Sequence, residues 1–166
     1  MPDRGVTVAL IGPPAAGKSR LGKRLAVRLG LPFVDTDTLV VAQHGPIPAI
    51  FAEHGEPHFR ALERVAVAQA LAEPGVVALG GGAVLDTDTQ ADLARARVVL
   101  LTIRPEAIAK RLGSGKRPLT DDLDSWKRVV ASRADLYNAL ADYTADTSTR
   151  PIDTIVEEIA AWVEEG

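Results

Sequence analysis

The segment GPPAAGKS, residues 12–19, has the residue types and spacing that most directly suggest chemistry. It follows a short apolar run, residues 6–11, and precedes leucines with helical spacing. Glycines let the backbone curl so that successive N–H groups face one anion, and a helix N-terminus adds the positive end of its dipole. We therefore predict a nucleotide phosphate site, with Lys18 reaching the β- and γ-phosphates and Ser19 offering its hydroxyl to Mg²⁺.

The alternative for this segment is a glycine turn that only caps a helix and leaves Lys18 in solvent. The strand expected before it and the helix expected after it favour the phosphate site. Ala15 stands where many such loops have another glycine. We therefore expect its peptide to adopt ordinary φ and ψ angles.

Two carboxylates, Asp35 and Asp37, follow a second short strand expected at residues 32–35. In open α/β sheets, ligands bind outside the carboxyl ends of the strands. Alternation along an extended segment would put both carboxylates on one side. One could hold the water shell of Mg²⁺, and the other could orient or deprotonate an acceptor hydroxyl. The alternative is a solvated turn or a helix N-cap, where aspartate is common.

A third candidate is Arg60, in the segment GEPHFRALE. On a helix it could pair with Glu63 as a surface ion pair, or it could point into a cleft and bind a carboxylate in bidentate geometry. Phe51 and Phe59 nearby are expected in the core. The triple glycine at residues 80–82 fits either a plain turn or a close backbone approach. The three histidines are expected at the surface and not as a metal site: His44, His54 and His58.

Strands that alternate with helices must position these residues. Besides the two strands above, we expect strands at residues 76–79, 98–103 and 143–146. Helices are expected at residues 19–29, 47–72 with a break at Gly55, 87–96, 105–112, 125–140 and from Pro151 onward. The polar stretch 113–124 is expected to be a long loop. This alternation predicts a parallel sheet covered by helices on both faces.

Composition excludes several classes of protein. The 166 residues fit one domain, residues 1–166, with 46% hydrophobic and 25% charged residues. The net charge of -3 and the lack of a basic block give no nucleic-acid footprint, and the absence of cysteine excludes disulfides. No apolar run approaches the ~20 residues of a membrane span. The first strand starts too soon after the N-terminus for a signal peptide, so we expect a cytoplasmic protein.

The order of these motifs resembles that of the shikimate kinase family, P-loop kinases of the nucleoside-monophosphate-kinase type. The segments that carry the resemblance are GPPAAGKS, DTD, Phe51 with GEPHFRALE, GGG, Arg111 with RPL at residues 117–119, and Arg133 with LY at 136–137. It covers nearly the whole chain. It implies a three-layer α/β/α P-loop NTPase fold with about five parallel strands, acceptor-binding helices at about 37–64 and a mobile lid at about 113–124.

The resemblance also implies roles for individual residues. The nucleotide, ATP, would be bound by Gly12, Ala15, Ala16, Gly17, Lys18, Ser19, Arg20, Arg111, Arg117 and Arg150, the last flanking the adenine together with Arg111. Ser19 and Asp35 would serve Mg²⁺. The acceptor, shikimate, would be bound by Asp37, Arg60, Gly81 and Arg133, with Asp37 as the base and the two arginines on its carboxylate. Lys18 and Arg117 would stabilise the transferring phosphoryl group.

Two other functions remain open at this point. One is a related kinase for another small hydroxy acid such as gluconate, although the acceptor motifs of that family are not found. The other is a nucleotide-binding regulatory protein without catalysis. Residues 45–48, GPIP, depart from the polar segment that the family prefers, which bears on acceptor preference. We expect a monomer.

Overall fold

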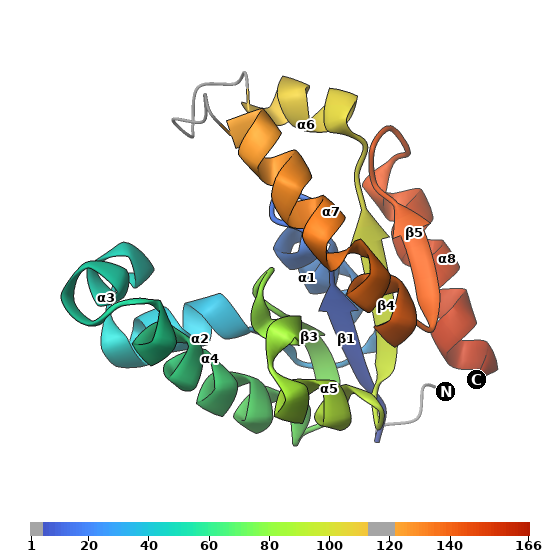
Figure 1. Cartoon of the computed structure of the whole chain (residues 1–166). Coiled ribbons are helices and arrows are strands. Elements are labelled where there is room, and N and C mark those ends of the chain that lie inside the picture. The colour runs from blue at the N-terminus through green and yellow to red at the C-terminus, as the bar shows by residue number, and fades with distance from the viewer. Residues whose placement is uncertain (1–4, 113–121) are drawn as a thin grey trace.

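The computed structural model describes residues 5–112 and 122–166, with backbone alone at 111, 112 and 122. Its centre is a five-stranded sheet in the order β2-β3-β1-β4-β5 (Figure 1). All neighbouring strands are parallel. The strands are β1 (Thr7–Ile11), β2 (Phe33–Asp35), β3 (Gly75–Ala78), β4 (Arg97–Thr102) and β5 (Tyr143–Asp146). The predicted parallel sheet of about five strands is confirmed.

Helices cover both faces of this sheet. The helices of the described residues are α1 (Lys18–Leu29), α2 (Thr36–His44), α3 (Ile47–His54), α4 (Glu56–Leu71), the 3₁₀ turn η1 (Ala83–Leu85), α5 (Thr87–Leu93), α6 (Pro105–Leu112), α7 (Asp122–Leu140) and α8 (Ile152–Glu165). On one face, apolar residues of α1 and α8 pack on the strands. On the other face, α4, α5 and α7 do so. The predicted three-layer α/β/α arrangement is therefore confirmed.

Local sequence explains why α1 forms where it does. Leu21, Leu25 and Leu29 recur at helical spacing and are buried against the sheet. The helix ends at Gly30, whose φ of 68° is left-handed and therefore favours glycine, as the sequence predicts. This helix places the phosphate segment at its N-terminus, directly after β1.

Residues 36 and 37 correct one prediction, because they begin the helix α2 and do not continue an extended segment. Asp35 is the N-cap of α2, and its Oδ1 accepts hydrogen bonds from the backbone N–H groups of Asp37 at 2.9 Å and Thr38 at 3.2 Å. A capping aspartate satisfies helix donors that otherwise have no partner. The N-cap alternative therefore describes Asp35, and the alternation argument does not apply.

The predicted loop at 113–124 needs a second correction. Residues 122–124 belong to α7, which begins at Asp122. Residues 113–121, and with them most of the predicted lid, lie outside the described residues. The predicted break at Gly55 is confirmed, because this glycine separates α3 from α4 with a φ of 83°.

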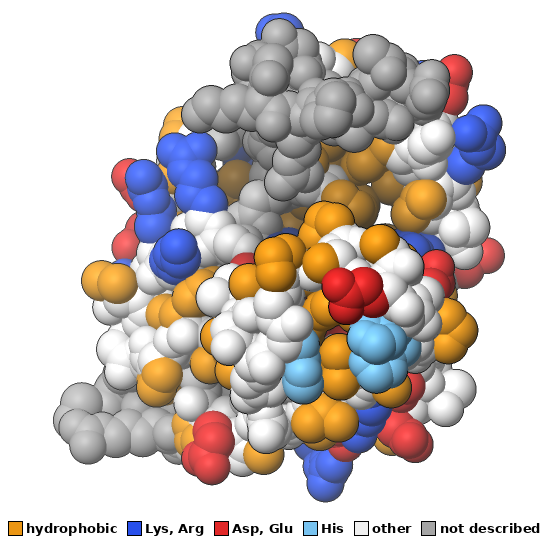
Figure 2. Space-filling view, turned by 90° about the vertical axis from the view of Figure 1, so that its left-hand side faces the viewer, with side chains coloured by type: hydrophobic (Ala, Val, Ile, Leu, Met, Phe, Trp, Pro, Cys, Tyr) orange, Lys and Arg blue, Asp and Glu red, His pale blue; other side chains and the backbone are white. Residues whose placement is uncertain are grey.

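Helices α2, α3 and α4 enclose a small third cluster of apolar residues beside the sheet. Phe59 belongs to it and is 4% exposed, as predicted for a core residue. Phe51 is 36% exposed and only borders Phe59, at 4.9 Å between ring centroids, so its predicted core position is wrong. The three histidines are exposed, as predicted. Histidine side chains are visible on the face of the molecule that Figure 2 shows. Among the described residues, no helix is long and apolar enough to cross a membrane.

Candidate active site

The loop between β1 and α1 curls because three of its residues have left-handed φ. Gly12 has φ 145°, Ala15 has φ 69° and Gly17 has φ 94°. A Cβ on Gly12 would lie 2.3 Å from the Leu101 carbonyl oxygen, so only glycine fits there. The expectation of ordinary angles at Ala15 is wrong. The curl that turns N–H groups toward one anion needs a left-handed residue here, and alanine adopts it at a modest cost.

Lys18 lies over this loop from the first turn of α1. Its ammonium donates hydrogen bonds to the carbonyl oxygens of Gly12 at 2.7 Å and Pro13 at 2.9 Å. Burial lowers the pKa of Lys18 to about 8, although the nearby Asp37 and Asp35 carboxylates favour its charged form. The ammonium therefore stands in a poorly hydrated position from which it can reach an anion in the loop.

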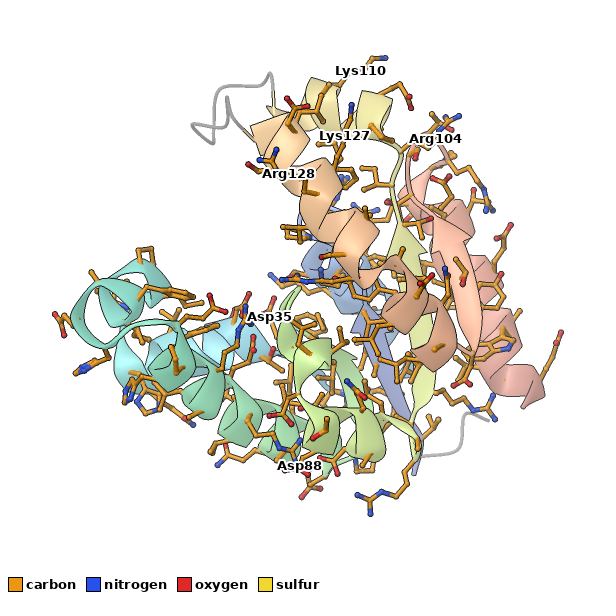
Figure 3. The ribbon with its side chains drawn as sticks, viewed as in Figure 1. Asp35, Asp88, Arg104, Lys110, Lys127 and Arg128 are labelled. Atoms are coloured by element: carbon orange, nitrogen blue, oxygen red, sulfur yellow. The ribbon has the colours of Figure 1, made fainter. Side chains whose placement is uncertain are left out.

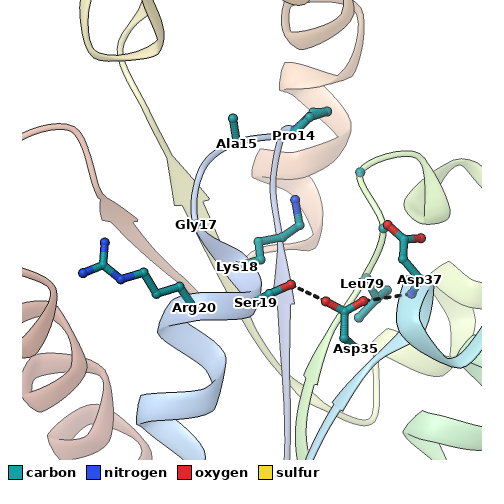
Figure 4. A pocket seen from close by; sticks show the side chains of 11 residues that line it. Pro14, Ala15, Gly17, Lys18, Ser19, Arg20, Asp35, Asp37 and Leu79 are labelled. Carbon is teal, nitrogen blue, oxygen red and sulfur yellow. Dashed lines mark hydrogen bonds between the residues drawn. The ribbon is translucent and has the colours of Figure 1, made fainter. Parts of the chain in front are cut away.

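Ser19 and Asp35 are in direct contact. The Ser19 hydroxyl donates a hydrogen bond to Asp35 Oδ2, while Oδ1 of the same carboxylate caps α2 (Figure 4). Asp35 lies at the carboxyl end of β2 (Figure 3) and lines the same cavity as Ser19. A hydroxyl and a carboxylate side by side are hard oxygen donors of the kind that Mg²⁺ takes together with phosphate oxygens. These two residues therefore fit the predicted metal site.

Asp37 lies in the first turn of α2, two residues after the cap, and lines the same cavity as Lys18 (Figure 4). Burial and the neighbouring Asp35 carboxylate raise the pKa of Asp37, while Lys18 and Arg60 act in the opposite direction. A raised pKa brings a carboxylate closer to the range in which a general base works well.

These residues surround a cavity of about 400 Å³ between the loop and the end of β3. It is lined by Pro14, Ala15, Gly17, Lys18, Ser19, Arg20, Asp35, Asp37, Leu79, Gly80 and Gly81. The cavity thus joins the predicted phosphate, metal and base positions to one of the predicted acceptor positions, Gly81.

The triple glycine follows β3 and makes room for charged side chains. A Cβ on Gly80 would lie 2.7 Å from Asp37 Oδ1 and 2.8 Å from Glu63 Oε2. A Cβ on Gly82 would lie 2.6 Å from both terminal nitrogens of Arg60. Neither of these glycines has a left-handed φ, so the reason for glycine is space. Of the two interpretations of GGG, the structure favours close approach.

Arg60 is held beside this turn by a buried carboxylate. Its Nη1 lies 2.8 Å from Glu63 Oε1, and Glu63 is only 3% exposed. Burial raises the pKa of Glu63, against the opposing effect of its hydrogen bond with Arg60. Arg60 Nε is buried and has no hydrogen-bond partner among the described residues. The ion pair exists, but its carboxylate is buried, so it is not a surface pair. Arg60 Nε also lies 3.7 Å from Glu56 Oε1, in a second ion pair.

Helix α7 brings Arg133 and Tyr137 to the other side of the turn. The Tyr137 hydroxyl donates a hydrogen bond of 2.7 Å to the carbonyl oxygen of Gly81. Burial raises the pKa of Tyr137, while a hydrogen bond with the Arg133 side chain and then its charge counteract this. A Cβ on Gly81 would lie 3.6 Å from Arg133 Nη1. Arg60 and Arg133 therefore flank the glycine turn, although neither lines the central cavity itself.

A second cavity of about 330 Å³ adjoins the phosphate loop on the side of α8. Arg20 and Arg150 line it, together with Ala16 and Gly17. Arg150 forms an ion pair with Glu158. Arg150 is thus brought next to the loop, which its sequence surroundings alone do not indicate.

The structure does not describe the side chains of two residues that were predicted to bind the nucleotide. Arg111 belongs to α6, of which the structure describes only the backbone at this position. Arg117 lies outside the described residues. The exposed cations Lys110, Lys127 and Arg128 lie on α6 and α7 (Figure 3). Their charge is suited to attract an anionic nucleotide.

Sequence reasoning missed several residues that shape the site. Thr36 is fully buried, and its hydroxyl accepts a 3.1 Å hydrogen bond from the Gly80 N–H. Thr147 donates to the carbonyl oxygen of Ala16 at 2.7 Å. Trp126 donates through its indole N–H to the carbonyl oxygen of Pro14 at 2.9 Å. Of these three residues, only Thr36 could have been suspected from the sequence, because it lies between the two functional aspartates.

Fold and site together define the class of protein. A phosphate loop joins a central parallel strand to a helix, and an acidic pair stands at the end of a nearby strand; this is the arrangement of a P-loop kinase. The family model described as shikimate kinase matches residues 14–164. The chain belongs to the shikimate kinase family, and it is an ATP-dependent kinase.

Individual relatives agree with this assignment. A shikimate kinase of Thermobifida fusca is 46% identical over 156 residues, which cover 91% of each chain. The structure of a shikimate kinase from Acinetobacter baumannii in complex with shikimate is similar with a TM-score of 0.89 and 30% identity, over 96% of this chain and 93% of that one. A gluconokinase from Sinorhizobium meliloti has a TM-score of 0.69 at 17% identity, covering 98% and 93%, which shows the fold alone. The gluconate alternative is therefore not favoured.

Proposed function

We propose that this chain transfers the γ-phosphoryl group of ATP to the 3-hydroxyl of shikimate, a step of aromatic amino-acid biosynthesis. The observation that carries this proposal is the 400 Å³ cavity in which Lys18 and Ser19 of the phosphate loop face Asp37 and the glycine turn. A phosphate site and a carboxylate base within one cavity are what phosphoryl transfer to an alcohol requires.

On the acceptor side, Asp37 accepts the proton of the attacking hydroxyl. Its raised pKa and its place in the cavity suit this role. Arg60 and Arg133 bind the carboxylate of the acceptor, and the Gly81 backbone contacts a ring hydroxyl. The terminal nitrogens of Arg60, which lie beside Gly82, support an anionic ligand at the turn, because a guanidinium binds a carboxylate in bidentate geometry.

On the donor side, the loop N–H groups and Lys18 bind the phosphates, and Arg117 joins Lys18 on the transferring group. Ser19 and Asp35 would hold Mg²⁺, which neutralises charge on the β- and γ-phosphate oxygens when bound. The side chains here do little covalent chemistry. They align the reacting oxygens and stabilise the charge that develops between them.

The nucleotide base would occupy the second cavity, between Arg20, Arg150 and the loop, with Arg111 on its other side. Its position next to Ala16 and Gly17 supports this placement. The adenine contacts, the cytoplasmic location and the monomeric state stay predictions.

The proposal is tested by measuring ADP release against a panel of small hydroxy acids that includes shikimate, quinate and gluconate. We expect shikimate to give a kcat/KM at least ~10²-fold above each of the others, because a site that pairs buried charges with one substrate rejects analogues that leave them unpaired. Equal rates with gluconate, or ADP release that no acid stimulates, would contradict it.

A further inference from the structure

Helix α7 contacts both sides of the central cavity. Near its N-terminus, the Trp126 indole N–H donates a 2.9 Å hydrogen bond to the Pro14 carbonyl oxygen in the phosphate loop. Near its C-terminus, the Tyr137 hydroxyl donates a 2.7 Å hydrogen bond to the Gly81 carbonyl oxygen in the glycine turn. One helix therefore bonds to the backbone of the donor loop and to the backbone of the acceptor turn.

Trp126, Arg133 and Tyr137 lie on one face of α7. They are separated by seven and four residues, which is close to two turns and one turn of an α-helix. Arg133 is thus carried between the two bonding residues, on the side of the helix that faces the cavity. The helix spacing fixes where these three side chains stand relative to one another.

The two backbone segments that α7 bonds are themselves close together. A Cβ on Gly81 would lie 3.2 Å from Pro14 Cδ, and both residues line the central cavity. A small shift of either segment would therefore change the distance between the donor phosphate and the acceptor hydroxyl. Near-attack geometry is sensitive to such shifts, because a misplacement of about 1 Å can cost ~10²-fold in rate.

The helix is well anchored for this task. Tyr137 is 3% exposed and belongs to the apolar cluster on one face of the sheet. Trp126 and Leu123 pack against the cluster on the opposite face. Because α7 is fixed at both ends by packing as well as by hydrogen bonds, it resists independent movement of the two segments.

We propose that α7 sets the spacing between the donor loop and the acceptor turn, with Trp126 and Tyr137 as positioning residues. This inference rests on the proposed function, because the two segments are taken to hold the donor and the acceptor of one reaction. Neither residue needs to touch a substrate. Each acts on the reaction through the backbone segment to which it is bonded.

The kinetic test uses Trp126→Phe, Tyr137→Phe and the double variant, all of which keep an aromatic ring in place. We expect each single change to lower kcat with shikimate by ~10-fold and to change the shikimate KM by less than ~3-fold. The double variant should lose no more than ~30-fold in kcat, because releasing one end of α7 already lets the loop and the turn move apart. If the two residues acted independently, their separate losses in kcat would multiply to ~100-fold.

The chain offers matched controls. Trp162, its other tryptophan, packs on Tyr143 at 5.2 Å between ring centroids, away from the cavity. Trp162→Phe should keep wild-type kcat. Val163, a residue of α8 that is 7% exposed, provides a control for stability. Val163→Ala should lower Tm and leave kcat unchanged. A kcat loss in the α7 variants therefore cannot be attributed to lower stability.

A second readout needs no turnover. In the Trp162→Phe background Trp126 is the one tryptophan of the chain, so its emission reports on the loop that it contacts. We expect ADP to change this emission. We also expect the added Tyr137→Phe change to weaken the apparent ADP affinity by ~3-fold or more, although Tyr137 is bonded to the acceptor turn.

The outcomes separate this inference from the proposed function. A wild-type protein that phosphorylates no shikimate contradicts the proposed function, while the ADP titration still decides the inference. Single variants with kcat within 2-fold of wild type, a double variant near the ~100-fold product, or an ADP affinity unaffected by Tyr137→Phe each overturn the role of α7. Reduced kcat, non-additivity and weaker ADP binding support it.

Discussion

The phosphate loop of the central cavity comes from one continuous segment, whereas the acceptor side is assembled from several separate elements. Residues 12–20 run from the end of β1 into α1 and supply the phosphate loop. The acceptor residues come from α2, α4, the turn after β3, and α7. The first is a local backbone structure, and the second exists only when distant segments pack correctly.

The two sides also use different groups to bind negative charge. The donor side presents backbone N–H groups at a helix N-terminus and one lysine. The acceptor side relies on side-chain guanidinium groups, one of which is fixed by the buried Glu63. We therefore expect loss of the donor-side lysine to act mainly on kcat, and loss of an acceptor-side arginine to act mainly on the acceptor KM.

The largest effect is expected at Lys18. Lys18→Ala removes a charge that stabilises the transferring phosphoryl group, so kcat should fall by at least ~10³-fold. Lys23→Ala, a change at an exposed lysine of the same helix, should keep wild-type turnover. A folded Lys18→Ala protein with near-normal kcat would contradict the donor-side assignment.

The two aspartates should separate by role. Asp37→Asn removes the base and should lower kcat by ~10²-fold or more, with weaker acceptor binding. Asp35→Asn should instead raise the Mg²⁺ concentration needed for half-maximal activity. Asparagine also caps helices well, so α2 should stay intact in this variant. Full activity of Asp37→Asn beside a dead Asp35→Asn would reverse the two roles.

The arginines test the acceptor side. Arg60→Ala or Arg133→Ala should raise the shikimate KM by roughly 30-fold or more, because a charged partner is left unpaired. The ATP KM should change far less. With a neutral analogue that lacks the carboxylate, the wild type should have a low kcat/KM. The arginine variants should lower this kcat/KM only slightly further. Equal damage to ATP and shikimate binding would mean that these arginines do not distinguish the two sides.

The smallest effect is a dependence on pH through Glu63. Because burial raises the pKa of this carboxyl above its ordinary value, acidification protonates it earlier than an exposed glutamate. Its ion pair with Arg60 is then lost, so the shikimate KM should rise by a few fold as the pH falls from neutral toward 5. Glu63→Gln lacks this titration and should show a flatter profile. Identical profiles for both proteins would exclude this role.

The difference between the two sides also explains what could be predicted from the sequence. The phosphate loop, its strand and its helix follow from contiguous residues, and they were predicted correctly except for the left-handed φ of Ala15. The sheet follows from apolar runs bounded by glycine and proline. The acceptor side was indicated mainly by resemblance to a family, because the spacing of Arg60 and Arg133 carries no signal of its own.

What the sequence could not show depends on tertiary contacts. The burial of Glu63 depends on packing beneath α4, since an acid three residues after an arginine also fits a surface pair. The start of α2 at Thr36 was not foreseen from the residues, because it is set by the Asp35 cap and the side chains of α2 lack a strong amphipathic pattern. The contacts of Trp126 and Tyr137 join residues more than fifty positions apart, which local patterns do not encode.

The central claim is that one cavity brings the γ-phosphate of ATP to the 3-hydroxyl of shikimate. Phosphorus NMR of the product after incubation with ATP, Mg²⁺ and shikimate tests this most directly. We predict one new phosphate monoester signal, coupled to the ring proton on carbon 3, formed in equal amount to ADP. Phosphate released only as the free ion, or an ester on another hydroxyl, would contradict the account.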